Sequence, residues 1–281
     1  IGDLFQLPPV VNRNEFNTLQ RYYKSVWFYE SKALKEAGFV YIEFDKIFRQ
    51  KDSVFIDILN NLRNNTVSKD DIDILNSHIK SEEEIDALTE VITLTTHNHK
   101  ADAMNQQALK KLDSLSYYFD AYIEGDFPES ICPALPRLEL KEGAQIMFIR
   151  NDNEDQLYYN GKLATVIKIA GDQIEVKLAD SGTTVTLRRE KWENKKYTIH
   201  PETKELEEEV IGSFEQYPIK LAWAITVHKS QGLTFEKAII DVGQAFADGQ
   251  VYVALSRLRS LDGLVLRTPI NKSVINTDKE I

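Results

Sequence analysis

The hydrophobic period of this 281-residue sequence changes twice along the chain, and no other feature constrains its fold as strongly. Between residues 52 and 112 apolar side chains recur at helical spacing, but from Leu138 to Phe214 they alternate with polar ones. After Pro218 short apolar runs and helical spacing return. Because a period near 3.6 marks helices and a period of 2 marks half-buried strands, the sequence predicts an α/β domain interrupted by an antiparallel β-domain.

The first stretch of helical spacing divides into three segments. Asp52 to Arg63 places apolar residues on one face behind a Ser/Asp cap, and Ser68 with Asp71 forms a capping box ahead of a second helix. A short apolar run from Val91 to Leu94 precedes a third helix. The apolar face of that third helix comprises Ala101, Met104, Ala108, Leu109 and Leu112.

The alternating region holds four candidate strands, separated by turn signals such as Asn-Gly at the spacing of a small antiparallel barrel. They are Gln145–Arg150, Leu163–Ile169, Gln173–Leu178 and Thr183–Arg188. Beyond this region the pattern predicts apolar runs at residues 219–225 and 238–242, a helix near Val251 to Arg259 and a strand from Gly263 to Leu266.

Composition narrows the class of protein. A hydrophobic content of 42% over this length suffices for two compact units. No apolar run reaches the roughly 18 residues of a membrane span, and Ile1 to Leu4 carries no secretion signal, so we predict a cytoplasmic protein without a membrane partner. The single cysteine, Cys132, excludes an internal disulfide and leaves too few thiolates for a zinc or iron-sulfur site, so we expect no metal site.

The net charge of −10 argues against a nonspecific polyanion binder, because such proteins usually present a broad basic surface. The charge is unevenly spread, however. Between Lys220 and Arg267 six Lys and Arg accompany four Asp and Glu, whereas Glu202 to Glu209 holds five acids and one lysine. The sequence is therefore compatible with a local basic face.

The segment from Gly2 to Val10 places an acid and an amide just past an expected strand end, followed by two prolines. Ligands of open α/β sheets sit at such carboxyl ends of strands. Gln6 could orient a water molecule or sense a terminal phosphate, because an amide both donates and accepts hydrogen bonds. The alternative is an ordinary loop that the prolines terminate.

Phe48-Arg49-Gln50 follows the apolar run from Phe39 to Phe44 and lies just before a helix. Arg49 there can present a planar, permanently charged guanidinium to a phosphate. Most arginines at helix starts are solvated or paired with acids, so this segment alone specifies little.

Thr95 to Lys100 joins an expected strand to an expected helix and is rich in hydroxyl and amide groups. Free backbone N–H groups at helix N-termini bind phosphates. One alternative is an ordinary turn that caps the helix. Another is a zinc site formed by His97 and His99, but it would lack further ligands.

Ala224 to Phe235 concentrates hydroxyl, imidazole, ammonium, amide and glycine groups in one turn. Such a density of donors suits a polyanion, although a capped helix start is the alternative. Val253 to Arg259 then places Arg257 and Arg259 two positions apart on an expected helix, where they cannot share a face. One of them can therefore point at a ligand, as an arginine finger does in phosphoryl transfer, while the other stays in water.

A phosphate-binding loop of the form Gly-x-x-x-x-Gly-Lys-Ser/Thr is absent from the 281 residues. The closest match, Gly161-Lys162, has Gln156 in place of the first glycine and Leu163 in place of the hydroxyl residue. The chain also opens without Met, inside what reads as a strand-end motif. We therefore expect a piece of a longer protein that cannot cradle ATP phosphates by itself.

These segments, in this order, resemble the Pif-type DNA helicases, relatives of the RecD subunit of bacterial recombination nucleases. Within superfamily 1, Gly2 to Val10 looks like motif III, Phe48 to Gln50 like motif IV, Ala224 to Phe235 like motif V and Tyr252 to Arg257 like motif VI. The resemblance spans nearly the whole chain, and the joint occurrence of the motifs is more specific than any one of them.

The resemblance implies a fold in which a P-loop NTPase, RecA-like domain with a parallel sheet is interrupted by a small antiparallel barrel like those of Src-homology 3 domains. Its implied domains are the tail of a first RecA-like domain at residues 1–38, a second RecA-like domain at residues 39–137 and 217–281, and the inserted barrel at residues 138–216. The rest of the first RecA-like domain, with the phosphate loop and the metal-binding acids, would lie upstream of Ile1.

The resemblance also implies roles for individual residues. Gln6 would sense the γ-phosphate of ATP, Arg49 and Arg257 would contact it, and Gly232 would lie near the nucleotide, which binds with Mg²⁺ in the intact protein. Single-stranded, forked or structured DNA would be the partner, and the chain alone would not turn over ATP. The residues implied to contact phosphates on single-stranded DNA, during 5′ to 3′ movement, are Thr96, Asn98, His228, Lys229 and Ser230.

Two other classes of function compete with a helicase. In a noncatalytic binding module, the β-region would dock a protein or nucleic acid through aromatics such as Tyr158, Tyr159 and Trp192. A nuclease would need clustered acids and a metal, but Asp70, Asp71 and Asp73 read as the solvated first turn of a helix. The loop from Leu115 to Arg137 and the acidic stretch near Glu207 match no motif.

Overall fold

The chain forms two compact units, which we describe one at a time. The first comprises Ile1–Ala87, Thr93–His97 and Thr226–Ile281, and the second comprises Leu88–Ile92 and Asn98–Ile225. The domain boundaries predicted at residues 38, 137 and 216 stay predictions. The computed structural model describes all residues except Ile1, Pro8, Val10, Asn12, Phe39, Asp45, residues 200–205 and residues 276–281. Part of the Gly2 to Val10 segment, and Phe39, where a second domain is predicted to begin, thus lie outside the described residues.

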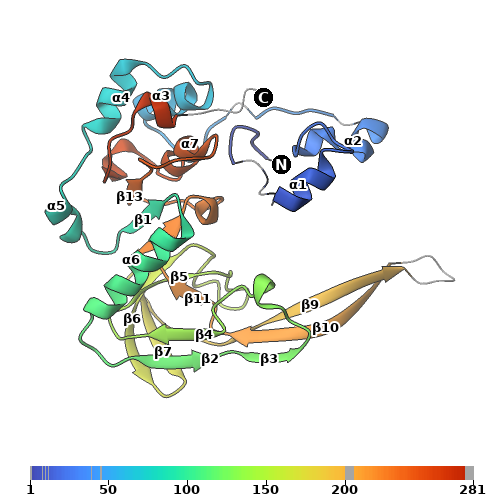
Figure 1. The fold of residues 1–281 in the computed structure, drawn as a ribbon. Coiled ribbons are helices and arrows are strands. Elements are labelled where there is room, and N and C mark those ends of the chain that lie inside the picture. Colours follow the sequence, from blue (N-terminus) through green and yellow to red (C-terminus); the bar gives the residue numbers. More distant parts are fainter. Residues whose placement is uncertain are drawn as a thin grey trace. The chain divides into compact units, whose positions relative to one another are not determined.

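A four-stranded sheet is the centre of the α/β fold (Figure 1). In spatial order its strands are β12 (Ala224–Thr226), β1 (Ile92–Thr95), β13 (Ala238–Asp241) and β14 (Leu264–Leu266). Strands β13 and β14 pair in parallel, and every residue of the four strands is buried. Strands buried on both faces are characteristic of parallel sheets covered by helices, and the predicted α/β class is confirmed.

The first unit also contains helices, and two of them begin where the sequence predicts. Helix α3 (Ser53–Arg63) is capped by Asp52, whose carboxylate accepts the N–H groups of Val54 and Phe55. Helix α4 (Lys69–Asn76) carries the predicted capping box of Ser68 and Asp71. Other helical segments of the first unit are α1 (Arg13–Leu19), η1 (Phe28–Glu30), α2 (Lys32–Ala37), α5 (Glu82–Asp86), η3 (His228–Ser230), η4 (Leu261–Gly263) and η5 (Lys272–Val274).

Helix α7 (Gln250–Leu255) is shorter than the sequence predicts, and it ends before Arg257. The prediction that Arg257 and Arg259 lie on a helix is therefore wrong. The reason is local, because the Ser256 hydroxyl and the Arg257 side chain both donate to the carbonyl of Val253 and compete with helix continuation. The two arginines still have different environments, since Arg257 is 2% exposed and Arg259 is exposed, but contact of either with a ligand stays a prediction.

The second unit contains the predicted antiparallel β-structure, built on a five-stranded sheet. A hydrophobic core runs through it, in which Ile146, Phe148, Val176 and Ile219 are completely buried. The strands, in spatial order, are β11 (Ile219–Leu221), β5 (Gln145–Phe148), β6 (Leu163–Ala170), β7 (Gln173–Leu178) and β8 (Thr184–Thr186). Four of the five match the predicted strands to within two residues at each end.

The sequence pattern did not predict a long hairpin or the short strands beside it. Strands β9 (Glu190–Ile199) and β10 (Leu206–Gln216) pair antiparallel and extend well beyond the rest of the second unit (Figure 1). The predicted loop from Leu115 to Arg137 is also partly wrong. It contains β2 (Tyr117–Asp120), β3 (Tyr122–Gly125), the start of β4 (Arg137–Leu140) and the short helix η2 (Glu129–Ile131).

The base of this hairpin is held by a buried polar side chain. Gln216 is 0% exposed, and its amide Nε2 donates to the carbonyl of Phe119 at 2.9 Å. Its Oε1 accepts the backbone N–H of Tyr217 at 3.0 Å. Helix α6 (Asn98–Lys111) lies in the same unit, where the Asn105 side chain bonds both backbone groups of Ala224 at 2.8 and 2.9 Å. None of the described helices is long and apolar enough to cross a membrane.

Candidate functional site

Arg49 and Gln50 lie in the extended segment before α3 and bind the turn that follows α7. Arg49 Nη1 donates to the carbonyl of Ser256 at 2.8 Å, and its Nε donates to the Thr234 hydroxyl at 2.9 Å. Gln50 Nε2 donates to the carbonyls of Ser256 at 3.2 Å and Leu258 at 2.7 Å. The last carbonyls of a helix lack intrahelical partners, so these side chains fix the end of α7.

Arg257 is buried at the same turn, and the nearby charge of Asp3 acts on it without an ion pair between the two. Its Nε donates to the Val253 carbonyl at 3.0 Å and its Nη2 to the Ser256 hydroxyl at 2.8 Å. Among the described residues no carboxylate forms an ion pair with it. Burial and the nearby charge of Arg49 lower the pKa of Arg257 to about 10, so the guanidinium stays protonated at neutral pH. Buried charges are normally paired, and an unpaired one marks a candidate anion site.

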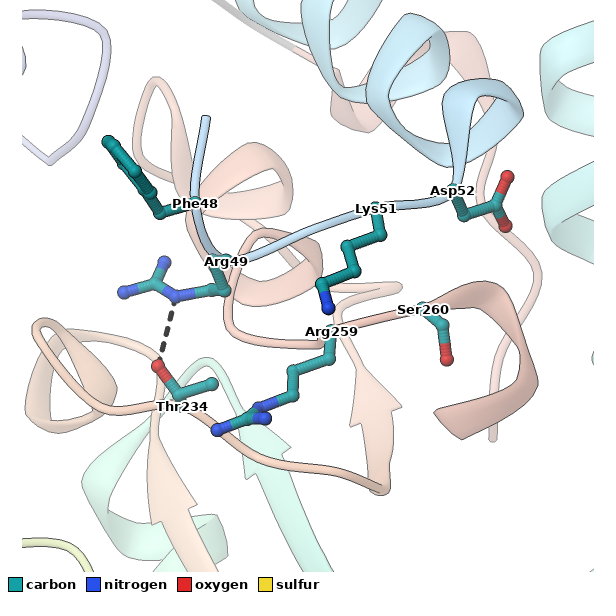
Figure 2. Close-up of a pocket in the computed structure, with 7 residues that line it drawn as sticks. All are labelled: Phe48, Arg49, Lys51, Asp52, Thr234, Arg259 and Ser260. Carbon is teal, nitrogen blue, oxygen red and sulfur yellow. Dashed lines mark hydrogen bonds between the residues drawn. The ribbon is translucent and has the colours of Figure 1, made fainter. Parts of the chain in front are cut away.

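An open pocket of about 740 Å³ adjoins Arg49 (Figure 2). Figure 2 shows Arg49, Lys51 and Arg259 around the same opening, whereas the carboxylate of Asp52 points away. Asp52 is engaged as the cap of α3, and Arg259 pairs with Glu236 at 3.0 Å. The lining residues are Phe48, Arg49, Lys51, Asp52, Thr234, Arg259 and Ser260. Even with Glu236 offsetting Arg259, positive side chains outnumber negative ones here, so the pocket suits an anion.

The loop from Gly2 to Leu7 is organised by Asp3. Asp3 Oδ2 accepts hydrogen bonds from Gln6 Nε2 at 3.3 Å and from the Tyr252 hydroxyl at 3.1 Å. Arg63 Nε lies 3.7 Å from Asp3 Oδ1. Burial, followed by the charge of Asp3, raises the pKa of Tyr252 to about 12, so its hydroxyl stays protonated and donates. Gln6 is thereby held beside α7.

A close backbone contact joins this loop to the start of α7. Gly249 has φ +71°, and a Cβ atom there would lie 2.5 Å from the carbonyl oxygen of Phe5 and 3.1 Å from that of Gln6. Only glycine allows this approach. A second pocket, of about 380 Å³, connects the same loop to the turn after β12, because residues of both segments line it, including Asp3, Leu7 and His228.

The turn after β12 carries several of the predicted DNA contacts. The ring of His228 stacks on Phe246 with centroids 6.3 Å apart, and burial lowers the pKa of His228. Lys229 is exposed, whereas Ser230 is buried and its hydroxyl donates to the Val227 carbonyl at 2.7 Å. Exposed Gly232 has φ +80°, a conformation that suits glycine.

Thr96 and Asn98 follow β1 but belong to different units. Thr96 is buried, and its hydroxyl lies 2.7 Å from Nδ1 of His97. The ring of His97 contacts Phe246 at a centroid distance of 4.9 Å. Asn98 is exposed as the first residue of α6 in the second unit.

Comparison with known proteins shows what this arrangement resembles. No protein-family model matches the chain. The ATP-dependent DNA helicase Pif1 of Bdellovibrio bacteriovorus is 30% identical over 271 residues, which are 95% of this chain and 56% of that protein. The human ATP-dependent DNA helicase PIF1 is 30% identical over 269 residues, which are 94% of this chain and 39% of that protein. The chain thus spans about half the length of the curated relatives that it matches, or less.

Solved structures agree with the curated relatives. A Bacteroides Pif1 in complex with ADP-AlF4 is 40% identical, with a TM-score of 0.83 over 99% of this chain and 64% of that one. A Bacteroides Pif1 bound to single-stranded DNA is also 40% identical, with a TM-score of 0.74 and the same coverage. The chain is a relative of the Pif1 DNA helicases.

In this Pif1 relative the predicted site residues fall into two groups within the first unit. Gln6, Arg49 and Arg257 converge on the two ends of α7, and Asp3 and Tyr252 complete that group. Thr96, Lys229 and Ser230 lie on the turns that also carry His97 and His228. The chemical role of each remains a prediction.

Four residues that contact or support the predicted site residues were not singled out from the sequence, namely Thr234, Tyr252, Phe246 and Gln250. Thr234 and Tyr252 lie inside the recognised motifs, but their partners Arg49 and Asp3 are 185 and 249 residues away, so no local signal pairs them. Phe246 is an isolated aromatic residue in the loop before α7, and its spacing from Gly249 and Gln250 is visible in the sequence.

Proposed function

We propose that this chain supplies the second motor domain and the inserted β-domain of an ATP-dependent DNA helicase. The buried guanidinium of Arg257, beside Arg49 and without a carboxylate partner in the described part of the chain, carries this proposal. Such a cation is stabilised when a phosphate arrives, and it can neutralise charge that develops on a transferred phosphoryl group.

In this proposal Gln6, Arg49 and Arg257 face the γ-phosphate of ATP, and Gly232 lies near the nucleotide. The cation-rich pocket beside Arg49 fits phosphate groups. Mg²⁺ would accompany ATP, but no cluster of three or more metal-binding side chains exists among the described residues, so its ligands would come from elsewhere. The phosphate-binding loop would likewise come from a first RecA-like domain outside these 281 residues.

DNA would bind the second group of residues through its phosphates. Thr96, Asn98, His228, Lys229 and Ser230 are the proposed contacts, on single-stranded or forked DNA, with movement from 5′ to 3′. Support comes from a Bacteroides Pif1 structure bound to single-stranded DNA and from a second solved structure, which concerns unwinding at forked double-stranded DNA by two coordinating Pif1 helicases. Ser230 would act through its backbone, because its hydroxyl is committed to Val227.

The proposed organisation assigns residues 1–38 to the first RecA-like domain, residues 39–137 and 217–281 to the second, and residues 138–216 to a Src-homology-3-like barrel. The antiparallel sheet of the second unit supports the last assignment. A cytoplasmic location is part of the same proposal.

The test is ATP turnover, with and without single-stranded DNA, for the intact protein that includes the proposed upstream domain. We expect DNA-stimulated turnover in the wild type and none in the 281-residue chain alone. Arg257→Ala should lower turnover about a thousand-fold, as loss of an arginine finger does. Arg257→Lys, which keeps the charge but loses the planar fork, should lower it nearly as far.

Arg188→Ala is the matched control, because Arg188 is an exposed arginine in the second unit that pairs with Glu154. It should turn over ATP like the wild type. If Arg257→Ala retains DNA-stimulated turnover, the assignment of Arg257 is refuted. If the intact wild type never hydrolyses ATP yet binds DNA, the chain is a noncatalytic binding module.

A further inference from the structure

Phe246 is an exposed aromatic side chain held between two histidines. Its side chain is 63% exposed. The ring of His97 lies 4.9 Å from it at an interplanar angle of 46°, and the ring of His228 lies 6.3 Å from it at 20°. These histidines come from the two turns that carry Thr96 and Lys229, both proposed contacts of the DNA backbone.

The loop that presents Phe246 is held by a buried side chain. Gln250 is 1% exposed, and its Oε1 accepts the backbone N–H groups of Phe246 at 3.0 Å and Ala247 at 3.4 Å. The N–H of Ala245 also donates to the Val242 carbonyl at 2.9 Å. The backbone on both sides of Phe246 is therefore fixed while its ring faces solvent.

Exposure of one apolar side chain is common and by itself indicates nothing. The arrangement around Phe246 is more specific, because a buried amide fixes the backbone of an aromatic residue that contributes little to the core. Single-stranded nucleic acid is bound by pairing cations that follow the phosphates with aromatic rings on which bases stack. Lys229 is an exposed cation on the turn whose His228 contacts Phe246.

We propose that the exposed ring of Phe246 stacks on an unpaired base of single-stranded DNA, between the segments that hold its phosphates. The inference rests on the proposed function, since it requires that the chain binds such DNA. Stacking tolerates any base, because every base offers a flat face. Gln250 is the positioning residue that fixes the ring, and it does not touch the DNA.

The test measures the affinity of the intact protein for a thymidine oligonucleotide over a range of salt concentrations. Phe246→Ala should weaken binding by roughly 5- to 150-fold, the value of one base–aromatic stack. The slope of affinity against salt should not change, because no phosphate contact is lost. Phe246→Leu, which keeps apolar bulk without an aromatic ring, should weaken binding almost as far, and Phe246→Trp should restore it.

A strand of the same length built from abasic units isolates the stacking. Wild type and Phe246→Ala should bind this strand equally. Gln250→Ala should weaken binding to the thymidine strand, in the same direction as Phe246→Ala, and leave binding to the abasic strand unchanged. Tyr22→Ala is the control, because Tyr22 is equally exposed at 63% and lies outside both proposed groups.

Three outcomes overturn the inference. Unchanged affinity of Phe246→Ala for the thymidine strand refutes the stack, and so does an equal loss on the abasic strand, which would assign Phe246 a structural role. In both cases the wild type still binds DNA and the proposed function stands. If the wild type binds neither strand, the proposed function fails and the stacking fails with it.

Discussion

Replacement of Gly249 by alanine tests whether the loop carrying Gln6 must touch α7. Gly249 adopts φ +71°, a conformation that costs an alanine about 1–2 kcal/mol. Its added Cβ would lie 2.5 Å from the carbonyl oxygen of Phe5. That oxygen belongs to the backbone, so relief requires the loop to move. An ordinary contact near 3.4 Å needs a displacement of about 0.9 Å, the difference between 3.4 and 2.5 Å.

The displacement should break a specific hydrogen bond. The Tyr252 hydroxyl and Asp3 Oδ2 are 3.1 Å apart, close to the limit for such a bond. Hydrogen bonds to charged groups contribute about 1.5–3 kcal/mol. Gly249→Ala should therefore lower the free energy of unfolding of the first unit by about 2.5–5 kcal/mol in total, the sum of the backbone cost and the lost bond.

Gly171→Ala is the matched control. Gly171 has φ +59° in the turn between β6 and β7, and a Cβ atom there would meet nothing within 4 Å. Gly171→Ala should lower the free energy of unfolding only by the cost of the left-handed backbone conformation, about 1–2 kcal/mol. Urea unfolding measures both variants, and DNA-stimulated ATP turnover of the intact protein should fall for Gly249→Ala alone, because Gln6 moves with the loop. If Gly249→Ala and Gly171→Ala lose the same free energy of unfolding and turn over ATP at the same rate, the contact at Gly249 contributes neither to stability nor to turnover.

Three further predictions concern stability. Gln50→Ala leaves the Leu258 carbonyl without its side-chain donor, while Arg49 still donates to the Ser256 carbonyl, and it should lower the free energy of unfolding in urea by about 1–3 kcal/mol. Asn105→Ala removes both hydrogen bonds to Ala224 and should cost about 2 kcal/mol in the same assay, whereas a cost below 0.5 kcal/mol would contradict that role. Burial lowers the pKa of His228 below its usual 6.5, so below that pH the unfolded chain binds a proton that the folded chain does not. Wild-type thermal stability should therefore fall more between pH 7.5 and 5.5 than that of His228→Gln, and parallel losses would count against this.

The sequence predicted the fold where hydrophobic period and capping chemistry are local. The boundaries of α3 and α4 follow from Asp52 and Ser68, whose side chains bond N–H groups two or three residues away. The run from residue 219 to 225 shows the limit of this reasoning. It is continuous in sequence but forms two strands in different sheets, β11 and β12, because their partners lie far away in the chain.

The missed hairpin has a related cause. The described residues of β9 include no buried one, and residues 207–210 of β10 are exposed, so a hydrophobic period of 2 is missing from much of the hairpin. The two strands are held by pairing with each other, including a diagonal ion pair between Glu208 and Lys195, and by the buried Gln216. Cross-strand pairs of this kind can be recognised only when the register is known.

For the site, motif recognition identified the residues but not their geometry. Arg257 and Arg259 were assigned to one helix from their spacing, and the competition of side chains for the Val253 carbonyl was not foreseen. The absence of an ion pair at Arg257, within the described residues, is likewise a property of three-dimensional packing. It is also the observation that most directly supports phosphate chemistry.

The start of α7 connects the two groups of site residues. Gly249 contacts the loop that carries Gln6, and the next residue, Gln250, fixes the backbone of Phe246. The hydrogen bond from Gln6 to Asp3 is long, at 3.3 Å, so a phosphate could replace Asp3 as its acceptor at small cost. The same Asp3 oxygen also accepts the hydrogen bond of Tyr252, which lies in α7 two residues after Gln250. Loss of the Gln6 bond to Asp3 would therefore alter the hydrogen bonding of α7 close to Gln250. Under the proposed function, Gln6 at the nucleotide and Phe246 at the DNA are thus joined through a few adjacent residues, a physical network that both ligands would perturb.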